Sequence, residues 1–389
     1  MNNNIEQMIA KFRELFGSEC NEKVYFAPGR VNLIGEHTDY NGGHVFPCAL
    51  KIGTYAVVSE RDDQKLCMYS FNREENLIEI NLENIAYKKE QKWTNYVLGV
   101  IDALNENGYK VTRGFNLVVY GNIPIQSGLS SSASLEVLIA YMLRDLYHFD
   151  FDNTKLALMS QYAENHFVGV NCGIMDQFII SNGEENTALL LDTNTLEYER
   201  VKINLGEYKL VIMNTNKPRR LQDSKYNERR KECDEALLVL QTKLNVHALC
   251  EITVDEFESN KDLIQSTDIR KRAKHAISEN ERTLLAKKAL DKGDILTFGK
   301  LMNESHDSLR DDYCVTGKEL DTLVNLARSV EGTIGARMTG AGFGGCAIAL
   351  VKETELNHFY EIVSKGYKEN IGLDVTFVDG TIGGGPTKI

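Results

Sequence analysis

The segment of residues 122–134, Asn-Ile-Pro-Ile-Gln-Ser-Gly-Leu-Ser-Ser-Ser-Ala-Ser, is the feature that most constrains how this chain folds. Alternating apolar residues before it predict a strand (Phe115, Leu117 and Val119), and apolar residues at helical spacing after it predict a helix (Leu135, Leu138, Met142 and Leu146). A loop therefore leads directly into a helix whose first N–H groups lack partners within the helix, which attracts anions and phosphate above all. A single serine would suffice as an N-cap, so three serines after a glycine favour phosphate binding.

The chain of 389 residues is too long for one typical hydrophobic core, so we expect two domains. We place the boundary in the polar segment 193–206, which gives an N-terminal domain of residues 1–205 and a C-terminal domain of residues 206–389. The formal net charge of −12 argues against a nucleic-acid partner. An anionic ligand would therefore need a local basic site.

The eight cysteines are scattered without a Cys-x-x-Cys pair, which argues against a zinc site and favours reduced thiols. The N-terminus begins with polar residues and a short amphipathic segment instead of a signal-peptide core, and no apolar run reaches membrane length. We therefore expect a cytoplasmic protein with no membrane partner.

A polar cluster occupies residues 29–43, Gly-Arg-Val-Asn-Leu-Ile-Gly-Glu-His-Thr-Asp-Tyr-Asn-Gly-Gly. Solvent exposure would explain any one of these polar side chains. The interleaved Val31, Leu33 and Ile34 tie the segment to a core, however, so we expect the cluster to be held rigidly. Carboxylates and amides on a rigid backbone suit sugar hydroxyls, because each hydroxyl both donates and accepts hydrogen bonds.

Two acidic residues lie in largely apolar surroundings. Glu164 falls in a helical pattern at residues 154–167, where the alternatives are an exposed glutamate and a carboxylate directed at a metal beside the phosphates. Asp176 lies among apolar and small residues in the segment 170–178. A buried carboxylate needs a cationic partner, for which Arg30 is the candidate.

The remaining pattern predicts an α+β protein. Helices are expected at residues 5–16, 93–104, 294–308, 319–330 and 353–370, with a long, charged helix from residue 223. Strands are expected at residues 24–27, ending at Pro28-Gly29, and at 55–59, 66–70, 77–82, 188–192, 208–215, 334–338, 347–351 and 376–378.

The string Gly-Ala-Gly-Phe-Gly-Gly at residues 340–345 matches the G-x-G-x-x-G pattern, but its context excludes a dinucleotide site. A Rossmann fingerprint runs from a strand into a helix, whereas residues 346–351 have the composition of a strand. The segment is therefore expected to be a hairpin tip whose lack of side chains permits close approach to a ligand.

Three separated motifs resemble those of the galactokinases, members of the GHMP kinase superfamily: residues 29–41, 123–134 and 337–346. The first is similar to the galactokinase signature, the second to the phosphate loop and the third to the glycine-rich motif. Further agreement is found at residues 93–97, 173–177 and 302–313, so the resemblance spans nearly the whole chain.

The resemblance implies a two-domain GHMP kinase fold, with an N-terminal α+β domain, a ferredoxin-like C-terminal domain and the active site in the cleft between them. It implies ATP-dependent phosphorylation of the anomeric hydroxyl of D-galactose to α-D-galactose 1-phosphate and ADP, the first committed step of galactose breakdown. ATP and Mg²⁺ are the implied cofactors, and a monomer is expected.

The resemblance also assigns roles to residues of this sequence. Asp176 would be the catalytic carboxylate and Arg30 its charge-stabilising partner. The sugar would contact Glu36, His37, Thr38, Asp39, Gly173, Asp176 and Tyr226. The nucleotide would contact Ser70, Trp93 and Tyr96 near the base, and Gln126, Ser127, Gly128, Leu129, Ser130, Ser131 and Ser132 at the phosphates. The metal would lie at Ser132 and Glu164.

The chain departs from the superfamily pattern at one position. The phosphate loop of the superfamily usually has Pro-x-Gly-x-Gly-Leu, whereas Gln126 stands here in place of the first glycine. If this position required a positive φ, glutamine would be strained by roughly 1–3 kcal/mol. Because Gly128 and the serines that follow are intact, we expect activity to be retained.

Two other functions fit parts of this pattern. One is a kinase for N-acetylgalactosamine, which would require a pocket that admits a bulky C2 substituent. The other is a non-catalytic galactose and ATP sensor, a class that resembles kinases that have lost the Ser-Ala step of the phosphate loop. Ser132 and Ala133 are both present here, as are Asp176 and Arg30, which favours the enzyme.

Overall fold

The computed structural model describes residues 3–18, 21–73, 76–124, 127–218 and 222–389. Its helices are α1 (Asn3–Phe16), α2 (Thr94–Glu106), α3 (Ser131–Tyr147), α4 (Asn153–Tyr162), α5 (Met175–Asn182), α6 (Gln222–Leu240), α7 (Val254–Asn260), α8 (Thr267–Asp291), α9 (Ile295–Ser308), α10 (Gly317–Ser329) and α11 (Leu356–Ile371). Shorter helical turns are η1 (Asp39–Asn41), η2 (Leu82–Asn84), η3 (Lys89–Gln91), η4 (Ala163–Val168), η5 (Leu249–Glu251), η6 (Lys261–Leu263), η7 (Leu309–Tyr313) and η8 (Glu353–Glu355). Its strands are β1 (Lys23–Asn32), β2 (His44–Val45), β3 (Pro47–Glu60), β4 (Lys65–Ser70), β5 (Ile78–Asn81), β6 (Phe115–Gly121), β7 (Thr187–Asp192), β8 (Tyr198–Lys202), β9 (Tyr208–Asn214), β10 (Thr333–Thr339), β11 (Cys346–Lys352), β12 (Thr376–Asp379) and β13 (Thr387–Lys388).

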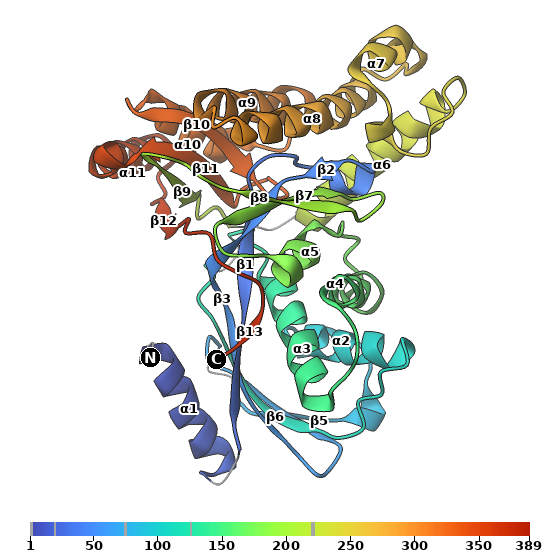
Figure 1. Ribbon diagram of the computed structural model, residues 1–389, viewed down its shortest axis with the longest axis vertical. Helices are drawn as coiled ribbons and strands as arrows, with labels where there is room; N and C mark the ends of the chain where they lie inside the picture. Colours follow the sequence, from blue (N-terminus) through green and yellow to red (C-terminus); the bar gives the residue numbers. More distant parts are fainter. Residues whose placement is uncertain (1–2, 19–20, 74–75, 125–126, 219–221) are drawn as a thin grey trace.

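A six-stranded sheet of order β13-β1-β3-β6-β4-β5 forms the base of the molecule (Figure 1). Helix α1 covers one face of this sheet, and α2, α3, α4 and α5 lie on the other. Alternation along the strands explains the two layers: Val57 packs toward α1, whereas its neighbours Ala56 and Val58 belong to the cluster around α3. The predicted α+β class is confirmed.

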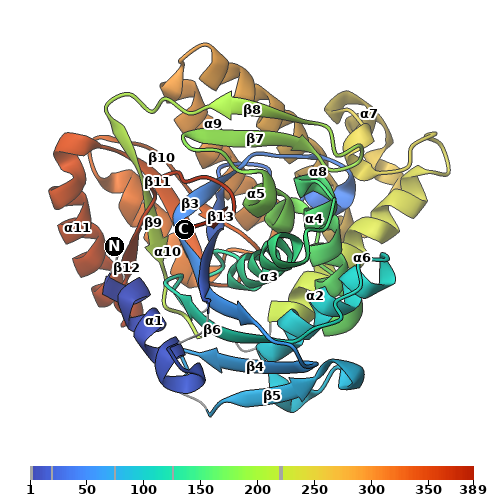
Figure 2. The ribbon, with the colours of Figure 1, turned by 60° about the horizontal axis from the view of Figure 1, so that its bottom comes forward.

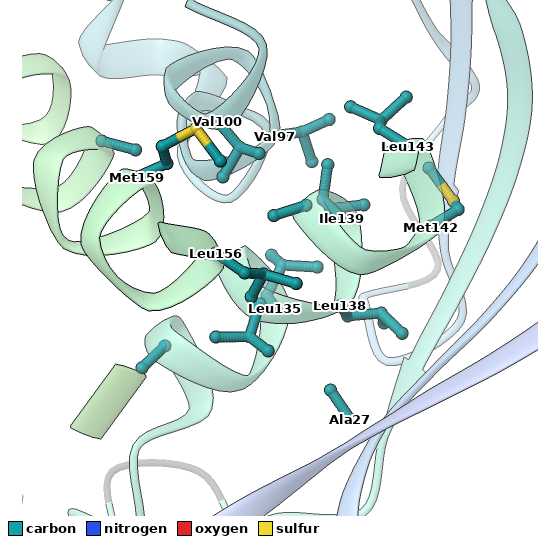
Figure 3. Packing of buried hydrophobic residues seen from close by; sticks show 14 of the residues in the cluster. Ala27, Val97, Val100, Leu135, Leu138, Ile139, Met142, Leu143, Leu156 and Met159 are labelled. Carbon is teal, nitrogen blue, oxygen red and sulfur yellow. The ribbon is translucent and has the colours of Figure 1, made fainter. Parts of the chain in front are cut away.

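The apolar cluster around α3 is the largest hydrophobic core (Figure 3). Leu135, Leu138, Ile139 and Met142 of α3 are all buried, as the predicted helical spacing requires. The hydroxyl of Ser134 donates to the carbonyl of Ala27 at 3.0 Å, which fixes the start of α3 against β1. The serine-rich helix start therefore has a rigid position.

Strand β1 is longer than predicted, and the expectation that it ends at Pro28-Gly29 is wrong. It continues to Asn32, and its pairing with β3 shifts register between Pro28 and Arg30. Such a bulge absorbs the residues that looked like a terminator. A Cβ on Gly29 would lie 2.9 Å from the carbonyl oxygen of Leu129, so glycine permits the phosphate loop to lie directly on the strand.

A second sheet of order β10-β11-β9-β12 is built from the C-terminal half, and the predicted hairpin of β10 and β11 is confirmed. Helices α10 and α11 cover one face of it. The other face packs toward α9 and the β1–β3 region in a shared apolar cluster that includes Ile348, Met302 and Phe46. This cluster joins the two halves of the molecule.

Segment 193–206 contains structure beyond a simple junction. Strand β8 lies within it and pairs with β7, and together with β2 they form a three-stranded sheet. The last strand, β13, returns to pair with β1 in the first sheet, where Figure 2 shows the C-terminus. We keep the boundary between residues 205 and 206 as a proposal. Within the described ranges, no helix has the length and apolarity needed to cross a membrane.

Candidate active site

A cavity of about 330 Å³ lies where the first strand, the start of α3, α5 and the glycine-rich hairpin meet. Residues predicted from the sequence to form the site line it: Arg30, Glu36, His37, Asp39, Gly128, Ser130, Ser131, Ser132, Gly173, Asp176 and Tyr226. These residues are far apart in the sequence, so the fold brings them together. Residues predicted to contact the sugar and residues of the predicted phosphate loop therefore line the same cavity.

Asp176, at the start of α5, and Arg30, near the end of β1, form a bidentate ion pair. The guanidinium Nε donates to Oδ1 at 2.6 Å and Nη2 donates to Oδ2 at 2.7 Å. The Arg30 side chain is 5% exposed and that of Asp176 is 28% exposed, so the carboxylate faces the cavity from a buried support. Parallel hydrogen bonds of this kind hold a carboxylate in one orientation. The predicted pairing is therefore present.

The phosphate loop joins this pair at Ser130. Ser130 has a left-handed backbone with φ +63° and makes no side-chain cap to α3. Its hydroxyl donates instead to Asp176 Oδ2, and the carbonyl of Gly128 accepts from Arg30 Nη1 at 2.8 Å. The first N–H groups of α3 are thus left for a ligand, as an anion site requires.

The other residues predicted for this loop differ in their surroundings. Ser131 is exposed and Ser132 half-buried, and both line the cavity, whereas Ser127 and Leu129 are buried behind it. Leu129 packs into the cluster shared by the two sheets. Gln126 lies outside the described residues.

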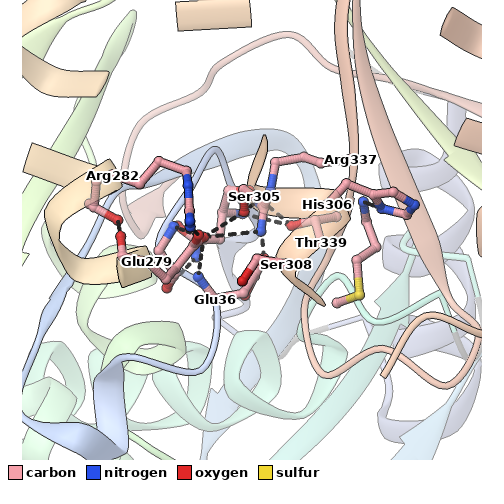
Figure 4. A network of polar contacts seen from close by, with 12 residues as sticks. Glu36, Glu279, Arg282, Ser305, His306, Ser308, Arg337 and Thr339 are labelled. Carbon is pink, nitrogen blue, oxygen red and sulfur yellow. Dashed lines mark hydrogen bonds and ion pairs between the residues drawn. The ribbon is translucent and has the colours of Figure 1, made fainter. Parts of the chain in front are cut away.

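Glu36 is anchored at the centre of a buried polar network (Figure 4). Its Oε1 accepts from the backbone N–H of Gly340 at 2.8 Å and from Arg337 Nη1 at 3.3 Å. Burial raises the pKa of Glu36, although Arg337 opposes this effect. Glu36 therefore connects the loop of residues 33–43, here called the polar loop, to the glycine-rich hairpin.

Glu279 of α8 holds the backbone of the polar loop. Its Oε1 accepts from the N–H groups of Gly35 and Glu36 at 3.0 and 3.3 Å and from the Ser305 hydroxyl at 2.6 Å. Arg282 donates to the other oxygen. A carboxylate from the second half of the chain therefore sets the position of a loop in the first half.

Asp39 and Gly173 lie directly against each other in the wall of the cavity. A Cβ on Gly173 would lie 1.8 Å from Asp39 Oδ2, so the carboxylate fits only because residue 173 lacks a side chain. Burial and the nearby carboxylates of Asp176 and Glu36 raise the pKa of Asp39 to about 7. Thr38 is turned away from this space, because its hydroxyl contacts the carbonyls of Gly35 and His44 within the turn.

The residues predicted to hold a metal lie together beside the serines. Ser132 lies close enough to the carboxyl of Glu164 to favour its ionised form. Burial, followed by the charge of Asp176, raises the pKa of Glu164. Clustered carboxylates of this kind are stabilised by a cation, and hydroxyl and carboxylate oxygens are the ligands that Mg²⁺ prefers. The residues therefore fit a magnesium ion.

Sequence reasoning missed two neighbours of Glu164. Gln177 donates from Nε2 to Glu164 Oε2 at 2.6 Å and to Glu136 Oε2 at 3.1 Å. Glu136 is fully buried on α3, and burial followed by the charge of Glu164 raises its pKa well above the ordinary value. The only signal in the sequence was an acidic residue on the otherwise apolar face of α3.

The residues predicted near the nucleotide base are not among those that line this cavity. Trp93 is 8% exposed and packs in the cluster around α3, and its indole N–H has no partner among the described residues. Tyr96 packs against the same cluster, and Ser70 is buried at the end of β4. Their contact with a nucleotide stays a prediction.

Three protein-family models match parts of this chain. Residues 10–60 match the galactokinase galactose-binding signature, residues 95–184 the GHMP kinases N terminal domain and residues 286–369 the GHMP kinases C terminal domain. The galactokinases of Clostridium beijerinckii and Clostridium acetobutylicum are 54% and 53% identical to the chain, with 99% of each sequence covered.

Solved structures give the same result. The structure of Lactococcus lactis galactokinase complexed with galactose is 48% identical, with a TM-score of 0.97 over 99% of this chain and 100% of that one. A mevalonate kinase at 20% identity and a TM-score of 0.62, over 91% of this chain and 97% of that one, shares the fold alone. The predicted GHMP kinase fold is confirmed, and the chain belongs to the galactokinase family.

Proposed function

We propose that this chain is a galactokinase that transfers the terminal phosphoryl group of ATP to the anomeric hydroxyl of D-galactose. The products would be α-D-galactose 1-phosphate and ADP, and the reaction would be the first committed step of galactose breakdown. The proposal is based on the position of Asp176, whose carboxylate accepts hydrogen bonds both from Arg30 of β1 and from Ser130 of the phosphate loop. One carboxylate thus adjoins both the sugar cluster and the helix start.

The proposed sugar contacts are the side chains of Glu36, His37, Asp39 and Tyr226 and the backbone at Gly173, all of which line the cavity. Thr38 would act within the turn that carries these residues. The proposed phosphate contacts are Ser130, Ser131 and Ser132 with the first N–H groups of α3. Trp93, Tyr96 and Ser70 remain proposed contacts of the base.

Catalysis would depend on alignment and charge stabilisation, because phosphoryl transfer requires little covalent chemistry from the protein. The anomeric oxygen would attack the terminal phosphorus while the bond to the ADP oxygen breaks. Aspartate is a weak base toward an alcohol, so Asp176 would orient the hydroxyl and receive its proton as the new bond forms. Arg30 would hold that carboxylate and stabilise charge on the transferring group.

We propose that Mg²⁺ accompanies ATP at Ser132 and Glu164. The ion would supply neutralisation of the phosphate charge. Gln177 would keep the Glu164 carboxylate turned toward Ser132, because it binds one of its oxygens at 2.6 Å.

We also propose that the enzyme is a cytoplasmic monomer. The described cysteines Cys48, Cys67, Cys172, Cys233, Cys250 and Cys314 are free thiols. Free thiols in this number are typical of a reducing compartment.

Asp176→Asn tests the proposal most directly, with Ser132→Ala as the matched comparison. ADP release should be followed with galactose, N-acetylgalactosamine, glucose and mevalonate, and galactose binding by calorimetry. We expect the wild-type enzyme to phosphorylate galactose. Asp176→Asn should bind galactose without turning it over. Ser132→Ala should lose more affinity for Mg·ATP than for galactose. Near-normal turnover of Asp176→Asn would contradict the mechanism, and preference for another substrate would contradict the function.

A further inference from the structure

A chain of hydrogen bonds runs from the second half of the molecule to His37 in the polar loop. The Cys233 thiol of α6 lies 3.2 Å from the hydroxyl of Tyr313 in η7. That hydroxyl lies 2.7 Å from the hydroxyl of Tyr40 in η1, which in turn lies 2.7 Å from Nδ1 of His37. The mechanism above uses none of the three residues before His37.

The members of this chain are held by packing. Cys233, Tyr313 and His37 are 1%, 0% and 4% exposed. The centroid of the Tyr313 ring lies 4.7 Å from that of the His37 ring and 4.5 Å from that of the His275 ring. Close packing disfavours other rotamers of these three side chains, whereas Tyr40 is half-buried.

His37 is one of the residues that line the cavity, beside Ala341, and its second ring nitrogen is buried. This nitrogen, Nε2, has no hydrogen-bond partner among the described residues. A buried polar nitrogen without a partner is costly, so it marks a place for a ligand atom. Burial lowers the pKa of His37 to about 3, so the ring is neutral and only one nitrogen carries a proton.

The geometry of the chain indicates which nitrogen carries that proton. The 2.7 Å separation between the Tyr40 hydroxyl and Nδ1 fits either group as the donor, so the direction of the hydrogen bonds is set at the other end of the chain. A thiol is a weak acceptor, so Tyr313 donates better to Tyr40 than to Cys233. Each hydroxyl therefore donates toward His37, and Nδ1 is the acceptor.

We propose that the hydrogen-bonded chain Cys233–Tyr313–Tyr40 fixes the tautomer of His37, so that its Nε2–H faces the cavity and donates to one oxygen of the sugar. This inference rests on the proposed function for the identity of the ligand. Tyr40 and Tyr313 are positioning residues, because they act through His37. Residues of the C-terminal half thus determine the hydrogen-bonding character of a group in the N-terminal half.

The first test is ¹⁵N NMR of the full-length enzyme labelled at histidine, with the His37 signals assigned by their absence from His37→Gln. We expect a protonated Nε2 in the wild type and a mixture of tautomers in Tyr313→Phe and in Tyr40→Phe. A proton on Nδ1 in the wild type, or an unchanged tautomer in both variants, would overturn the proposal. This measurement needs no turnover, so it stays decisive even if the proposed function fails.

The second test separates positioning from structural damage. In Tyr313→Phe we expect KM for galactose to rise about tenfold while kcat and KM for ATP stay within about twofold. Tyr25→Phe is the matched control. Tyr25 lies on β1 of the first sheet, is also fully buried, and donates a hydrogen bond from its hydroxyl to Asp145 at 2.5 Å. An equal rise of both KM values in Tyr313→Phe, or the same rise in Tyr25→Phe, would overturn the proposal.

A panel of deoxygalactoses and fluorodeoxygalactoses identifies the sugar oxygen. Fluorine is a weak hydrogen-bond acceptor and cannot donate a hydrogen bond. At the sugar position whose oxygen accepts from Nε2–H, the fluoro sugar should therefore bind better than the deoxy sugar. We expect this preference at one position in the wild type and its loss in Tyr313→Phe. If Tyr313→Phe fails to fold, Tyr40→Phe provides the same comparison. A preference retained in the folded variant would contradict the assignment.

Discussion

The apolar cluster around α3 and the polar network beneath the polar loop are both buried, yet they hold the molecule in different ways. The first consists of aliphatic and aromatic side chains on α2, α3, α4 and the large sheet (Figure 3). The second joins Glu36, Glu279 and Arg337 from three distant segments (Figure 4). Apolar contacts have little directional preference, whereas hydrogen bonds and ion pairs require defined geometry.

The polar network is suited to position a loop more than to stabilise the fold. Arg337 is fully buried and donates to the carbonyls of Asn32 and Leu33 as well as to Glu36. Removing charges from water costs much of what their attraction returns. We infer that the network is retained because it aligns the polar loop with the glycine-rich hairpin, and that the α3 cluster supplies the larger share of stability.

The largest expected effect comes from Arg337→Met. The change would leave Glu36 and Glu279 without their shared cation, which should cost about 3–5 kcal/mol in the free energy of unfolding. KM for galactose should also rise, because the polar loop loses an anchor. Urea unfolding and steady-state kinetics measure the two effects.

Lys352→Met is the control for Arg337→Met. Lys352 pairs with Glu207 at 3.1 Å on the surface of the same sheet. An exposed pair contributes about 0–1 kcal/mol, so this variant should remain close to the wild type. If the two variants were equally stable, the buried network would contribute no more to the free energy of unfolding than an exposed ion pair does.

Leu138→Ala should have the second-largest effect, of roughly 3 kcal/mol, because it leaves a cavity in the α3 cluster. Leu138 is fully buried. KM for galactose should not change at temperatures where the variant is folded, in contrast to Arg337→Met. Leu158→Ala is the control, because Leu158 is 40% exposed on α4 and should lose no more than about 0.5 kcal/mol. A raised KM with Leu138→Ala would remove the distinction between the two regions.

These two regions also show what the sequence could predict. The helical spacing in α3 identified its buried face, because apolar periodicity is a local signal. The pairing of Arg30 with Asp176 could be predicted across 146 positions, because a carboxylate among apolar residues needs a cation. The serines at the start of α3 were found from their unusual number.

The partners of the polar loop could not be predicted in the same way. Glu279 and Tyr313 lie on α8 and η7, and nothing in the local pattern indicates that they reach Glu36 or Tyr40. Contacts between polar residues far apart in the chain depend on how the two sheets pack, which leaves no periodic trace. Gln177 shows that neighbours in the sequence need not share a partner, because it follows Asp176 directly but donates a hydrogen bond to Glu164.

Glu279→Gln should have a smaller effect that depends on pH. Burial would raise the pKa of Glu279, but Arg282, His275 and Arg337 outweigh it and lower the pKa from 4.5 to about 2. A lowered pKa means that the ionised carboxylate stabilises the fold above pH 4.5 and that this contribution is lost as the pH falls toward 2. Between pH 4.5 and pH 3 the loss should be about 2 kcal/mol.

The measurement compares the free energy of unfolding of the wild type and Glu279→Gln across this range. The difference between the two proteins should shrink as the pH falls, because glutamine does not titrate. Burial lowers the pKa of His275 to about 4, and the charge of Glu279 opposes this effect, so the difference between the two proteins also contains the change in the titration of His275. Parallel curves would show that the charge of Glu279 contributes nothing to stability.

Met142→Leu should have the smallest effect and tests the other side of the comparison. Met142 is fully buried in the α3 cluster. Volume-conserving exchanges between apolar residues usually cost less than about 1.5 kcal/mol, because the surrounding side chains repack without losing a directional contact. We therefore expect a small loss in the free energy of unfolding and unchanged kinetics with galactose and ATP. A loss as large as that of Leu138→Ala, or any change in KM, would mean that this cluster also requires defined geometry, because the proposed phosphate-binding serines lie at the start of α3.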